Sequence, residues 1–477
     1  MRLKKIYKYI ISIIFFIPLV ILSYNIYKLN FLPMNYYIIL NVILLSISTL
    51  ANICLFVRKK WTKVITIIVY IFLTVISIIG IKYVGDTNSF LNKNFENAKN
   101  TYDLSYYIIS KNSYSIEDLI DKEIYYYEKT NKIEDVIKKV NNDVKASFIA
   151  IDSVERLIKS DIFLIDSASF EIQCELGTMK KNDYKVIYEV TMTFEEEIDS
   201  EEDIEGEKGN KGNSENKKEK DPDVLNIYIG GYDFSGVRMD FNALVTLNMR
   251  THKMVVTSIP RDFYLTIPGK GVKDTLSTMS PYGVNNNVRA VEGLLGVKVD
   301  YYLVVETTSL VKLVDTIGGI TYCSDKAYTT DHALVIGTYD DSKGEHLDII
   351  KGCQHLNGIE TLTVARERMA YETQDIARIK NDAKIMNAIL DKMKSPSIAT
   401  KYTSVLNAVG GMYTTTMPKT VVQDGVKSIL TSSWSIKNVY LSGKTTWGTV
   451  ELSGGYKYVM HPSQSSVNSA KQAIREI

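Results

Sequence analysis

Residues 254–262, Met254-Val-Val-Thr-Ser-Ile-Pro-Arg-Asp262, decide the fold of the C-terminal half of the chain. The apolar and β-branched residues before the proline predict a buried strand. Proline has no backbone N–H for a central ladder, so the strand must end at Pro260. Arg261 and Asp262 then lie at the tip of the strand. A cation and a carboxylate at a strand exit indicate a site for an anion, or for an anion with a metal ion.

Strands and helices alternate on both sides of this stretch. Further strands are predicted at 224–231, 242–249, 299–306 and 361–365, and helices at 288–295, 309–316 and 375–392. This alternation predicts an α/β fold with helices on the faces of a sheet. Ligands of open α/β sheets bind beyond the carboxyl ends of the strands, so charged residues at those ends are the candidates for a site.

Charged side chains follow several of these strands. Asp233 and Asp240 follow the first, and Arg366 and Arg368 follow the last. Residues two apart in an extended chain point to one face. Three further residues, spaced for one face of the next helix, are Asp375, Arg378 and Asp382. We expect these groups to converge with Arg261 and Asp262 at one edge of the sheet.

The chemistry of these side chains indicates the ligand class. Arginine forks bind phosphate oxygens through paired hydrogen bonds. Carboxylates beside phosphates hold magnesium, which takes one or two of them and keeps waters. The predicted ligand is a phosphate or pyrophosphate with a divalent ion. The alternative also stays open, namely surface ion pairs among Arg261, Asp262, Arg366, Glu367 and Arg368.

Three uncharged apolar segments, 9–27, 29–57 and 64–81, precede the soluble part. Each is near the roughly 20 residues that a membrane-spanning helix needs. The alternative is one anchor followed by buried core helices. Basic residues precede the first segment (Arg2, Lys4, Lys5, Lys8) and separate the second from the third (Arg58, Lys59, Lys60, Lys63), whereas only Lys28 separates the first from the second. The positive-inside rule therefore predicts a cytoplasmic N-terminus and an extracellular chain after about residue 85.

Composition divides the chain into four parts. We predict a three-helix transmembrane region at 1–85, a small α/β accessory domain at 95–198, a disordered charged linker at 199–222 and a second extracellular domain at 223–477. The net charge of +1 predicts no nucleic-acid partner. Cys323 and Cys353 bracket one loop-rich segment, and both a disulfide and two free thiols stay open.

The motifs of the second domain together resemble the LytR–CpsA–Psr family of cell-wall polymer ligases. The matching residues, in chain order, are Gly231-Tyr-Asp233, Arg238-Met-Asp240, Ser258-Ile-Pro-Arg-Asp262, Lys273, Gly318-Gly319, His355-Leu-Asn-Gly358, Arg366-Glu-Arg368, and Asp375 with Arg378. The three membrane helices and the accessory domain resemble the capsule-associated CpsA branch of the family.

The resemblance implies an α/β/α sandwich with an apolar pocket for a polyprenyl chain. It implies transfer of an anionic glycan (capsule or teichoic-acid-like) from a polyprenyl pyrophosphate carrier to peptidoglycan, assisted by magnesium or manganese. The partners are then the lipid-linked glycan, peptidoglycan and the membrane. The implied catalytic residues are Arg261, Asp240 and Asp233, with Asp233 and Asp240 at the metal. The implied pyrophosphate-binding residues are Arg238, Arg261, Lys273, Arg366, Arg368, Asp375 and Arg378.

Three residues depart from the family pattern and bear on activity and donor choice. Met239 stands where a small polar residue is usual, Asp274 where an apolar residue is usual, and Asp382 where glutamine is usual. Two other functions are possible with the same residues. One is hydrolysis of polyprenyl pyrophosphate, with water as the acceptor. The other is capture of the lipid-linked polymer by a binding or regulatory protein without turnover.

Overall fold

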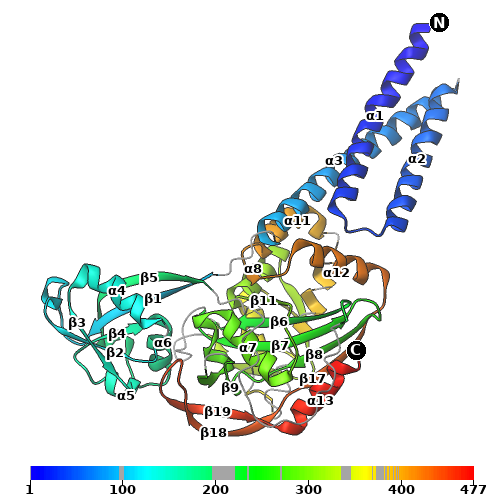
Figure 1. The fold of residues 1–477 in the computed structure, drawn as a ribbon. Coiled ribbons are helices and arrows are strands. Elements are labelled where there is room, and N and C mark those ends of the chain that lie inside the picture. Colours follow the sequence, from blue (N-terminus) through cyan, green and yellow to red (C-terminus); the bar gives the residue numbers. More distant parts are fainter. Residues whose placement is uncertain are drawn as a thin grey trace.

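The computed structural model describes residues 2–57, 59–95, 101–130, 132–195, 221–233, 236–268, 271–334, 345–367, 369–371, 381, 384–385, 387–389, 391–393, 395 and 397–477. Most of the predicted linker and of the predicted helix 375–392 lies outside these residues. So do four residues singled out from the sequence: Arg368, Asp375, Arg378 and Asp382. Figure 1 shows a membrane-helix region, a smaller α/β part and a larger α/β part.

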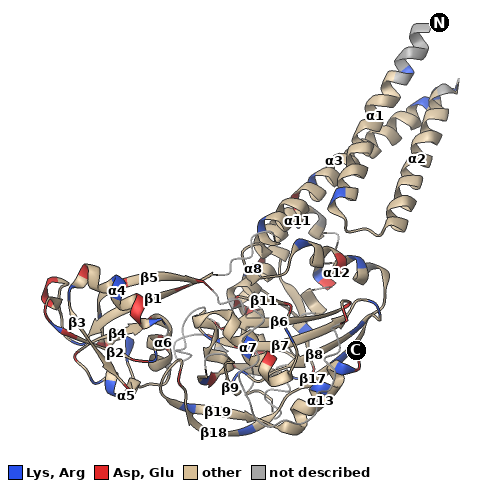
Figure 2. Ribbon diagram, viewed as in Figure 1, with Lys and Arg blue, Asp and Glu red and all other residues tan. Residues whose placement is uncertain are grey.

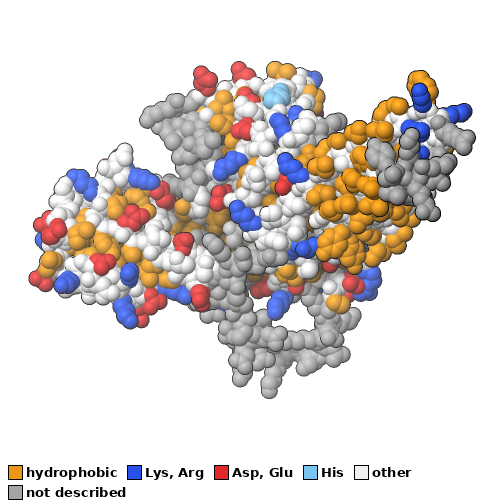
Figure 3. Space-filling model, turned by 90° about the horizontal axis from the view of Figure 1, so that it is seen from above, with side chains coloured by type: hydrophobic (Ala, Val, Ile, Leu, Met, Phe, Trp, Pro, Cys, Tyr) orange, Lys and Arg blue, Asp and Glu red, His pale blue; other side chains and the backbone are white. Residues whose placement is uncertain are grey.

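Three N-terminal helices confirm the predicted membrane segments. Helices α1 (Arg2–Leu29), α2 (Met34–Phe56) and α3 (Lys60–Phe95) are long and apolar enough to cross a membrane. Their large apolar side chains are exposed and form the broad hydrophobic surface in Figure 3. In Figure 2 the Lys and Arg residues of this region gather near the helix ends. The N-terminus and the α2–α3 turn lie at the end remote from the soluble parts (Figure 1).

Helix α3 continues well beyond the predicted segment 64–81 and packs on the soluble part. Its polar end contacts α11 (Ser397–Val409) and α12 (Lys419–Thr431). Thr403 Oγ1 donates to Asp86 Oδ2 at 2.6 Å, and Lys419 Nζ donates to Asn88 Oδ1 at 2.8 Å. The membrane region is thus joined to the C-terminal soluble part, residues 221–477, through side-chain contacts as well as through the covalent chain.

The smaller part, residues 101–195, is called the accessory domain below. Its five-stranded mixed sheet has the order β3-β2-β4-β1-β5. The strands are β1 (Thr101–Ser110), β2 (Glu123–Tyr127), β3 (Ser147–Ile151), β4 (Ile162–Asp166) and β5 (Lys185–Glu195). The helices are α4 (Ile133–Val144), α5 (Val154–Leu157) and α6 (Ser167–Glu175). Helix α4 buries apolar residues spaced three and four apart, which holds it to the sheet.

The larger part, residues 221–477, contains a six-stranded sheet of order β16-β11-β6-β7-β8-β17. Its strands are β6 (Val224–Tyr232), β7 (Met239–Asn248), β8 (Lys253–Ser258), β11 (Tyr301–Val305), β16 (Tyr413–Thr415) and β17 (Ser435–Tyr440). β7 is antiparallel to β6 and β8, whereas β11 runs parallel to β6. The predicted α/β class is confirmed. Because β6, β8 and β11 run the same way, their carboxyl ends meet at one edge of the sheet.

The two faces of this sheet differ in burial. Tyr228, Leu244, Val255 and Tyr302 are fully buried on one face, in one core with α7 (Val284–Leu295) and α13 (Gln464–Arg475). On the other face Ala243 and Val245 of β7 are buried, whereas the apolar side chains of β6, β8 and β11 are only half-buried. A second core forms between α8 (Thr307–Ile317), α9 (Gly358–Arg366), α11 and β12 (Ile320–Ser324).

Short two-stranded ladders complete the larger part. They pair β9 (Tyr264–Thr266) with β10 (Lys273–Thr275), β12 with β15 (Gly352–Leu356), β13 (Tyr328–Ala333) with β14 (His346–Ile349), and β18 (Gly443–Thr449) with β19 (Tyr456–Pro462). Cys323 and Cys353 face each other across the β12–β15 ladder and form a disulfide. This decides between the two alternatives left open above. Such a bond is typical of proteins outside the cytosol.

The predicted strand at 361–365 is wrong, because these residues belong to helix α9. The side chain of Asn357 accepts a hydrogen bond from Glu360 N at 3.0 Å, and Glu360 Oε2 accepts one from Asn357 N at 2.7 Å. This capping box starts the helix and overrides the β-branched residues that favour a strand. Arg366 therefore ends a helix, and the prediction that a strand places it on one face with Arg368 is wrong.

Candidate anion-binding site

Five predicted residues gather at the sheet edge where β6 and β8 end. Asp233 follows β6 directly, Asp240 is the second residue of β7, and Arg261 follows β8 after Pro260. The turn between β6 and β7 is closed by a hydrogen bond from Asp233 N to Arg238 O of 2.7 Å. We call Asp233, Arg238, Asp240, Arg261 and Asp262 the rim cluster.

Asp233 and Arg238 form the first pair of the rim cluster. The Asp233 carboxylate accepts from Arg238 N at 3.2 Å and lies 3.4 Å from Arg238 Nε. The Asp233 side chain is 5% exposed, whereas the Arg238 side chain is 24% exposed. The carboxylate is therefore fixed by the turn, and the guanidinium is partly open to solvent.

Arg261 is the centre of the second group. Its Nη1 donates to Asp240 Oδ1 at 2.6 Å, and its Nε lies 3.8 Å from Asp262 Oδ1. Between a quarter and a third of each of these three side chains is exposed, so each can reach a ligand. Burial acts against the charged form of Arg261, but Asp240 and Asp262 outweigh it and raise the pKa. The guanidinium is therefore a permanent positive charge at the rim.

The carboxylate oxygens of the rim cluster are of the kind that binds magnesium. Its carboxylates supply only oxygen ligands, which this hard cation prefers. Within the described residues, no group of three or more His, Cys, Asp or Glu is placed to enclose a metal ion. Magnesium takes one or two carboxylates and completes its shell with water and phosphate oxygens, so two carboxylates of the rim cluster would be enough to hold it. Asp233 and Asp240 are the carboxylates that could hold it.

Two other predicted residues, Lys273 and Arg366, belong to elements other than those that carry the rim cluster. Lys273 begins β10 with an exposed side chain, while its backbone N donates to Glu451 Oε2 at 2.8 Å. Successive strand residues point to opposite faces, so Asp274 is the buried one. Arg366 is half-buried in the last turn of α9. The roles of Lys273, Arg366, Arg368, Asp375 and Arg378 in binding stay predictions.

The departure at Met239 lies in the core rather than in the rim cluster. Its side chain is fully buried against Gly230, where a Cβ would lie 2.4 Å from Met239 Sδ. The methionine thus requires glycine on the neighbouring strand. Its neighbours Arg238 and Asp240 belong to the rim cluster, because side chains alternate along the strand.

The sequence reasoning missed Lys457. This residue of β19 is buried, its Nζ donates to Thr278 Oγ1 at 2.9 Å, and the Nζ lies 3.6 Å from Asp274 Oδ1. Burial lowers the pKa of Lys457, while Asp274 opposes that change and both Arg238 and Asp262 are within electrostatic range. One signal was available in the sequence, because Lys457 is two residues from the apolar Val459, and alternation along a strand places both side chains on one face.

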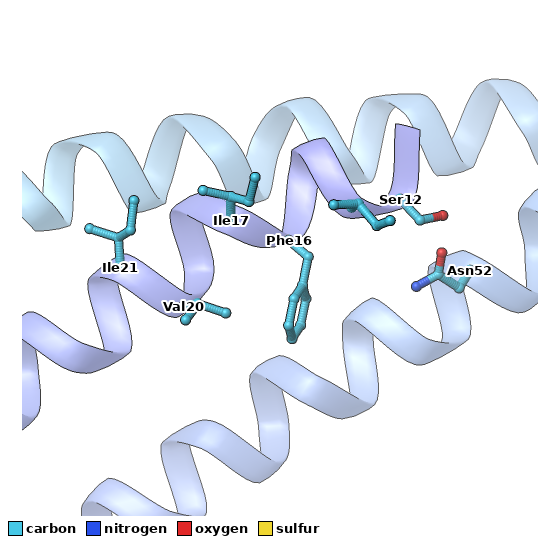
Figure 4. Close-up of a pocket in the computed structure, with 7 residues that line it drawn as sticks. Ser12, Phe16, Ile17, Val20, Ile21 and Asn52 are labelled. Carbon is cyan, nitrogen blue, oxygen red and sulfur yellow. The ribbon is translucent and has the colours of Figure 1, made fainter. Parts of the chain in front are cut away.

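A separate groove lies between the membrane helices. Figure 4 shows Phe16, Ile17, Val20 and Ile21 of α1 along it, with Ser12 and Asn52 near one end. Most of its lining is apolar, and it lies within the segments that are long enough to span a membrane. We therefore assign it to the lipid-facing surface and not to the ligand site.

Comparisons with known proteins agree with the motif pattern. Residues 187–476 match the LytR_cpsA_psr family. An uncharacterised protein of Staphylococcus aureus is 30% identical over 247 residues, which are 52% of this chain and 57% of that protein. The Bacillus anthracis polyisoprenyl-teichoic acid–peptidoglycan teichoic acid transferase TagU is 32% identical over 173 residues, which are 36% of this chain and 52% of that protein. The chain thus spans about half the length of these curated relatives.

Two solved structures are also similar. The crystal structure of B. subtilis TagU is 28% identical, covers 53% of this chain and 96% of that chain, and has a TM-score of 0.39. A TagT structure, bound to LI-WTA, is 24% identical, covers 55% of this chain and 94% of that chain, and has a TM-score of 0.41. Because the family match extends over more than half of the chain, this chain belongs to the LytR–CpsA–Psr family.

Proposed function

We propose that the chain is a membrane-anchored phosphotransferase that moves an anionic glycan from a polyprenyl pyrophosphate carrier to peptidoglycan. The observation that carries the proposal is the rim cluster, in which Arg238 and Arg261 lie among Asp233, Asp240 and Asp262 at the ends of β6 and β8. The teichoic acid transferase name of the TagU relatives supports a glycopolymer of this kind. A capsule-like or teichoic-acid-like polymer suits the rim equally well.

The chemistry asks for positioning and charge neutralisation more than for a protein nucleophile. An acceptor hydroxyl of peptidoglycan attacks the phosphorus that carries the glycan. A new O–P bond forms, the bond from that phosphorus to the bridging oxygen breaks, and polyprenyl phosphate leaves with the electron pair, while the hydroxyl releases its proton. Arg238 and Arg261 bind the pyrophosphate oxygens and stabilise the charge that develops on the leaving oxygen.

Asp233 and Asp240 are the residues that would hold magnesium or manganese. Bound there, the ion would neutralise phosphate charge as a Lewis acid. In the structure each carboxylate also contacts an arginine, since Asp233 pairs with Arg238 and Asp240 with Arg261. With a metal ion on these carboxylates, both arginines would lie beside it and within reach of the phosphate oxygens.

The half-buried face of the six-stranded sheet supports a role for a lipid carrier. Ile227 and Ile229 of β6, Val256 of β8, and Leu303 and Val305 of β11 share this face and stay half-buried. This apolar face is formed by the same strands whose carboxyl ends carry the rim cluster. It therefore suits a prenyl chain whose head group reaches Arg261. With the basic helix ends in the cytoplasm, the rim lies outside the cell, on a domain attached to α3.

The test uses the full chain in detergent or nanodiscs with a lipid-linked glycan, Mg²⁺ and peptidoglycan, and measures polymer bound to the wall. We expect transfer by the wild type and a loss of about 10²–10³-fold in Arg261→Ala, the size seen when one charge-stabilising donor is removed. The matched control is Arg250→Ala, since Arg250 forms exposed ion pairs with Asp221 and Asp223. We expect this variant to transfer normally.

Other outcomes would contradict the proposal. Transfer that Arg261→Ala leaves unchanged would remove the rim cluster from the reaction. Phosphate release without polymer attachment would identify a polyprenyl pyrophosphatase. Lipid binding without any turnover would identify a binding or regulatory protein.

A further inference from the structure

The accessory domain contacts the larger domain at two segments. The first is residues 273–283, called the loop segment below, and the second is residues 449–457, called the hairpin tip, between β18 and β19. Figure 1 shows α6 of the accessory domain on the side that faces the larger domain. Both segments approach the rim cluster, so the contacts bear on the site.

The contact with the loop segment is a buried polar network. Tyr282 OH donates to Asp166 Oδ1 at 3.2 Å and lies 2.9 Å from Ser169 Oγ. Ser169 N also donates to Asp166 Oδ1, at 2.7 Å, which caps helix α6. All three residues are buried. Separation of the domains would break the hydrogen bond from Tyr282 to Asp166 and replace it by hydrogen bonds to water, so this contact favours the joined arrangement by its net hydrogen-bond energy.

The contact with the hairpin tip is a close steric fit. Gly454 has a φ of +73°, and a Cβ on it would lie 2.2 Å from Val154 Cγ2. Gln173 Nε2 donates to Gly454 O at 3.2 Å. Lys129 Nζ and Glu451 Oε1 form an ion pair of 3.2 Å beside this contact. The accessory domain thus covers the hairpin tip so closely that only glycine fits below Val154.

Asp274 joins the two segments to each other. From the loop segment, its Oδ2 accepts hydrogen bonds from Leu452 N at 3.0 Å and from Ser453 N at 2.7 Å in the hairpin tip. Its Oδ1 accepts from Thr275 N and Thr278 Oγ1, both at 2.6 Å. Lys457 at the end of the hairpin tip donates to the same Thr278. The carboxylate is fully buried and its hydrogen bonds are directed to both segments.

The loop segment and strand β19, which leaves the hairpin tip, hold the backbone of Arg261 and Asp262. Ser277 N in the loop segment donates to Arg261 O at 2.8 Å. Met460 N, three residues beyond Lys457 on β19, donates to Asp262 O at 2.8 Å. A continuous chain of contacts therefore runs from the accessory domain through Asp274 to the turn that bears Arg261.

We propose that the accessory domain positions the rim cluster: it clamps the loop segment and the hairpin tip, and through the buried Asp274 and Lys457 it fixes the turn that carries Arg261 and Asp262. The consequence for ligand binding rests on the function proposed above for the rim cluster. A displacement of about 1 Å at a site that positions its substrate can cost about 10²-fold in rate. A domain that only bound a separate ligand would leave the rim unaffected.

The test compares two equal changes in the full-length protein in detergent. Val154→Asp places a charge over Gly454, and Val186→Asp places the same charge on β5, where Val186 is 53% exposed. Hydrogen–deuterium exchange is followed in peptides that cover residues 274–278 and 451–454. Binding of farnesyl pyrophosphate with Mg²⁺ is measured in parallel. We expect Val154→Asp to speed exchange in both peptides and to weaken binding at least about 10-fold, and Val186→Asp to change neither.

The two readouts separate the two proposals. Unchanged exchange and binding in Val154→Asp would overturn the positioning role. Failure of the wild type to bind farnesyl pyrophosphate would count against the proposed function of the rim, while the exchange data would still test the clamp. If Val154→Asp does not fold, Tyr282→Phe removes a single hydroxyl from the same interface. Faster exchange in residues 274–278 of that variant would support the clamp, and unchanged exchange would contradict it.

Discussion

The rim cluster and the Asp274–Lys457 pair both join an aspartate to a cation, but they differ in exposure. Arg261 and Asp240 lie 2.6 Å apart with side chains 27% and 34% exposed. Lys457 and Asp274 lie 3.6 Å apart with side chains 11% and 0% exposed. A ligand can reach the first pair but not the second. The difference in burial thus distinguishes the proposed binding site from the residues that we propose hold it in place.

The buried pair also depends on neutral hydrogen-bond partners. Removing two charges from water costs several kcal/mol per ion, which the attraction between them does not offset alone. Asp274 accepts from two backbone N–H groups of the hairpin tip, and Lys457 donates to Thr278. Loss of one member should therefore affect stability strongly, whereas loss of a rim residue should affect function.

The largest expected effect on stability is that of Asp274→Ala. It leaves Lys457 buried without its counter-charge and removes the link between the loop segment and the hairpin tip. We expect the free energy of unfolding to fall by about 3–5 kcal/mol. Chemical denaturation of the full chain in detergent measures it. The control Asp152→Ala breaks an exposed ion pair with Arg156 and should cost less than about 1 kcal/mol. Equal effects of the two changes would contradict a structural role for Asp274.

Arg261→Ala should lower the transfer activity strongly and the free energy of unfolding only slightly. We expect transfer to fall about 10²–10³-fold, equivalent to about 3–4 kcal/mol of transition-state stabilisation. Its ion pair with Asp240 is partly exposed, so the free energy of unfolding should change by only about 1 kcal/mol. Transfer assays and denaturation on the same preparation measure both quantities. A large loss of stability with little loss of transfer would place Arg261 in the scaffold.

Tyr282→Phe should have a moderate effect. The change removes the hydroxyl that contacts Asp166 and Ser169 across the domain interface. A lost buried hydrogen bond with an unsatisfied partner costs about 1–3 kcal/mol. Thermal unfolding should show this loss, and Tyr440→Phe, at an exposed tyrosine, should not. Identical unfolding of the two variants would argue against a tight interface.

The smallest expected effect is a pH dependence from Glu451. The backbone N–H of Lys273, with help from Lys129, holds the pKa of Glu451 below its ordinary value of 4.5. A lowered carboxyl pKa contributes stability above the unfolded pKa, and this contribution is lost as the pH falls through the folded value. Because the pair with Lys129 is partly exposed, the contribution should be below about 1 kcal/mol. Unfolding measured against acidic pH should be flatter in Glu451→Gln than in the wild type. A parallel dependence in both would rule Glu451 out.

The parts of the fold that local chemistry dictates could be predicted from the sequence. Pro260 ends β8 near the predicted point because proline cannot continue a ladder, and this places Arg261 beside Asp240. The apolar N-terminal segments became α1–α3 because their length and lack of charge allow little else. At 361–365, the capping box of Asn357 and Glu360 stabilises a helix and outweighs the preference of the β-branched residues for a strand.

The rest depends on contacts between residues that are far apart in the chain. Lys457 and Thr278 are 179 positions apart, so no local pattern announced their hydrogen bond. In the sequence, Asp274 differed from its neighbours only as a departure from a family pattern. In the structure it accepts five hydrogen bonds, from donors in both the loop segment and the hairpin tip. The contact between the accessory domain and the hairpin tip could not be predicted from the sequence for the same reason, since Val154 and Gly454 meet only after both domains have folded.

The most direct measurement is a structure of the full chain with a polyprenyl pyrophosphate and Mg²⁺. We predict pyrophosphate oxygens at about 3 Å from the guanidinium groups of Arg238 and Arg261. The prenyl chain should lie along the half-buried sheet face that contains Ile227 and Leu303. A pyrophosphate bound away from the ends of β6 and β8, with Arg261 still paired only to Asp240 and Asp262, would contradict the assignment of the rim cluster as the transfer site.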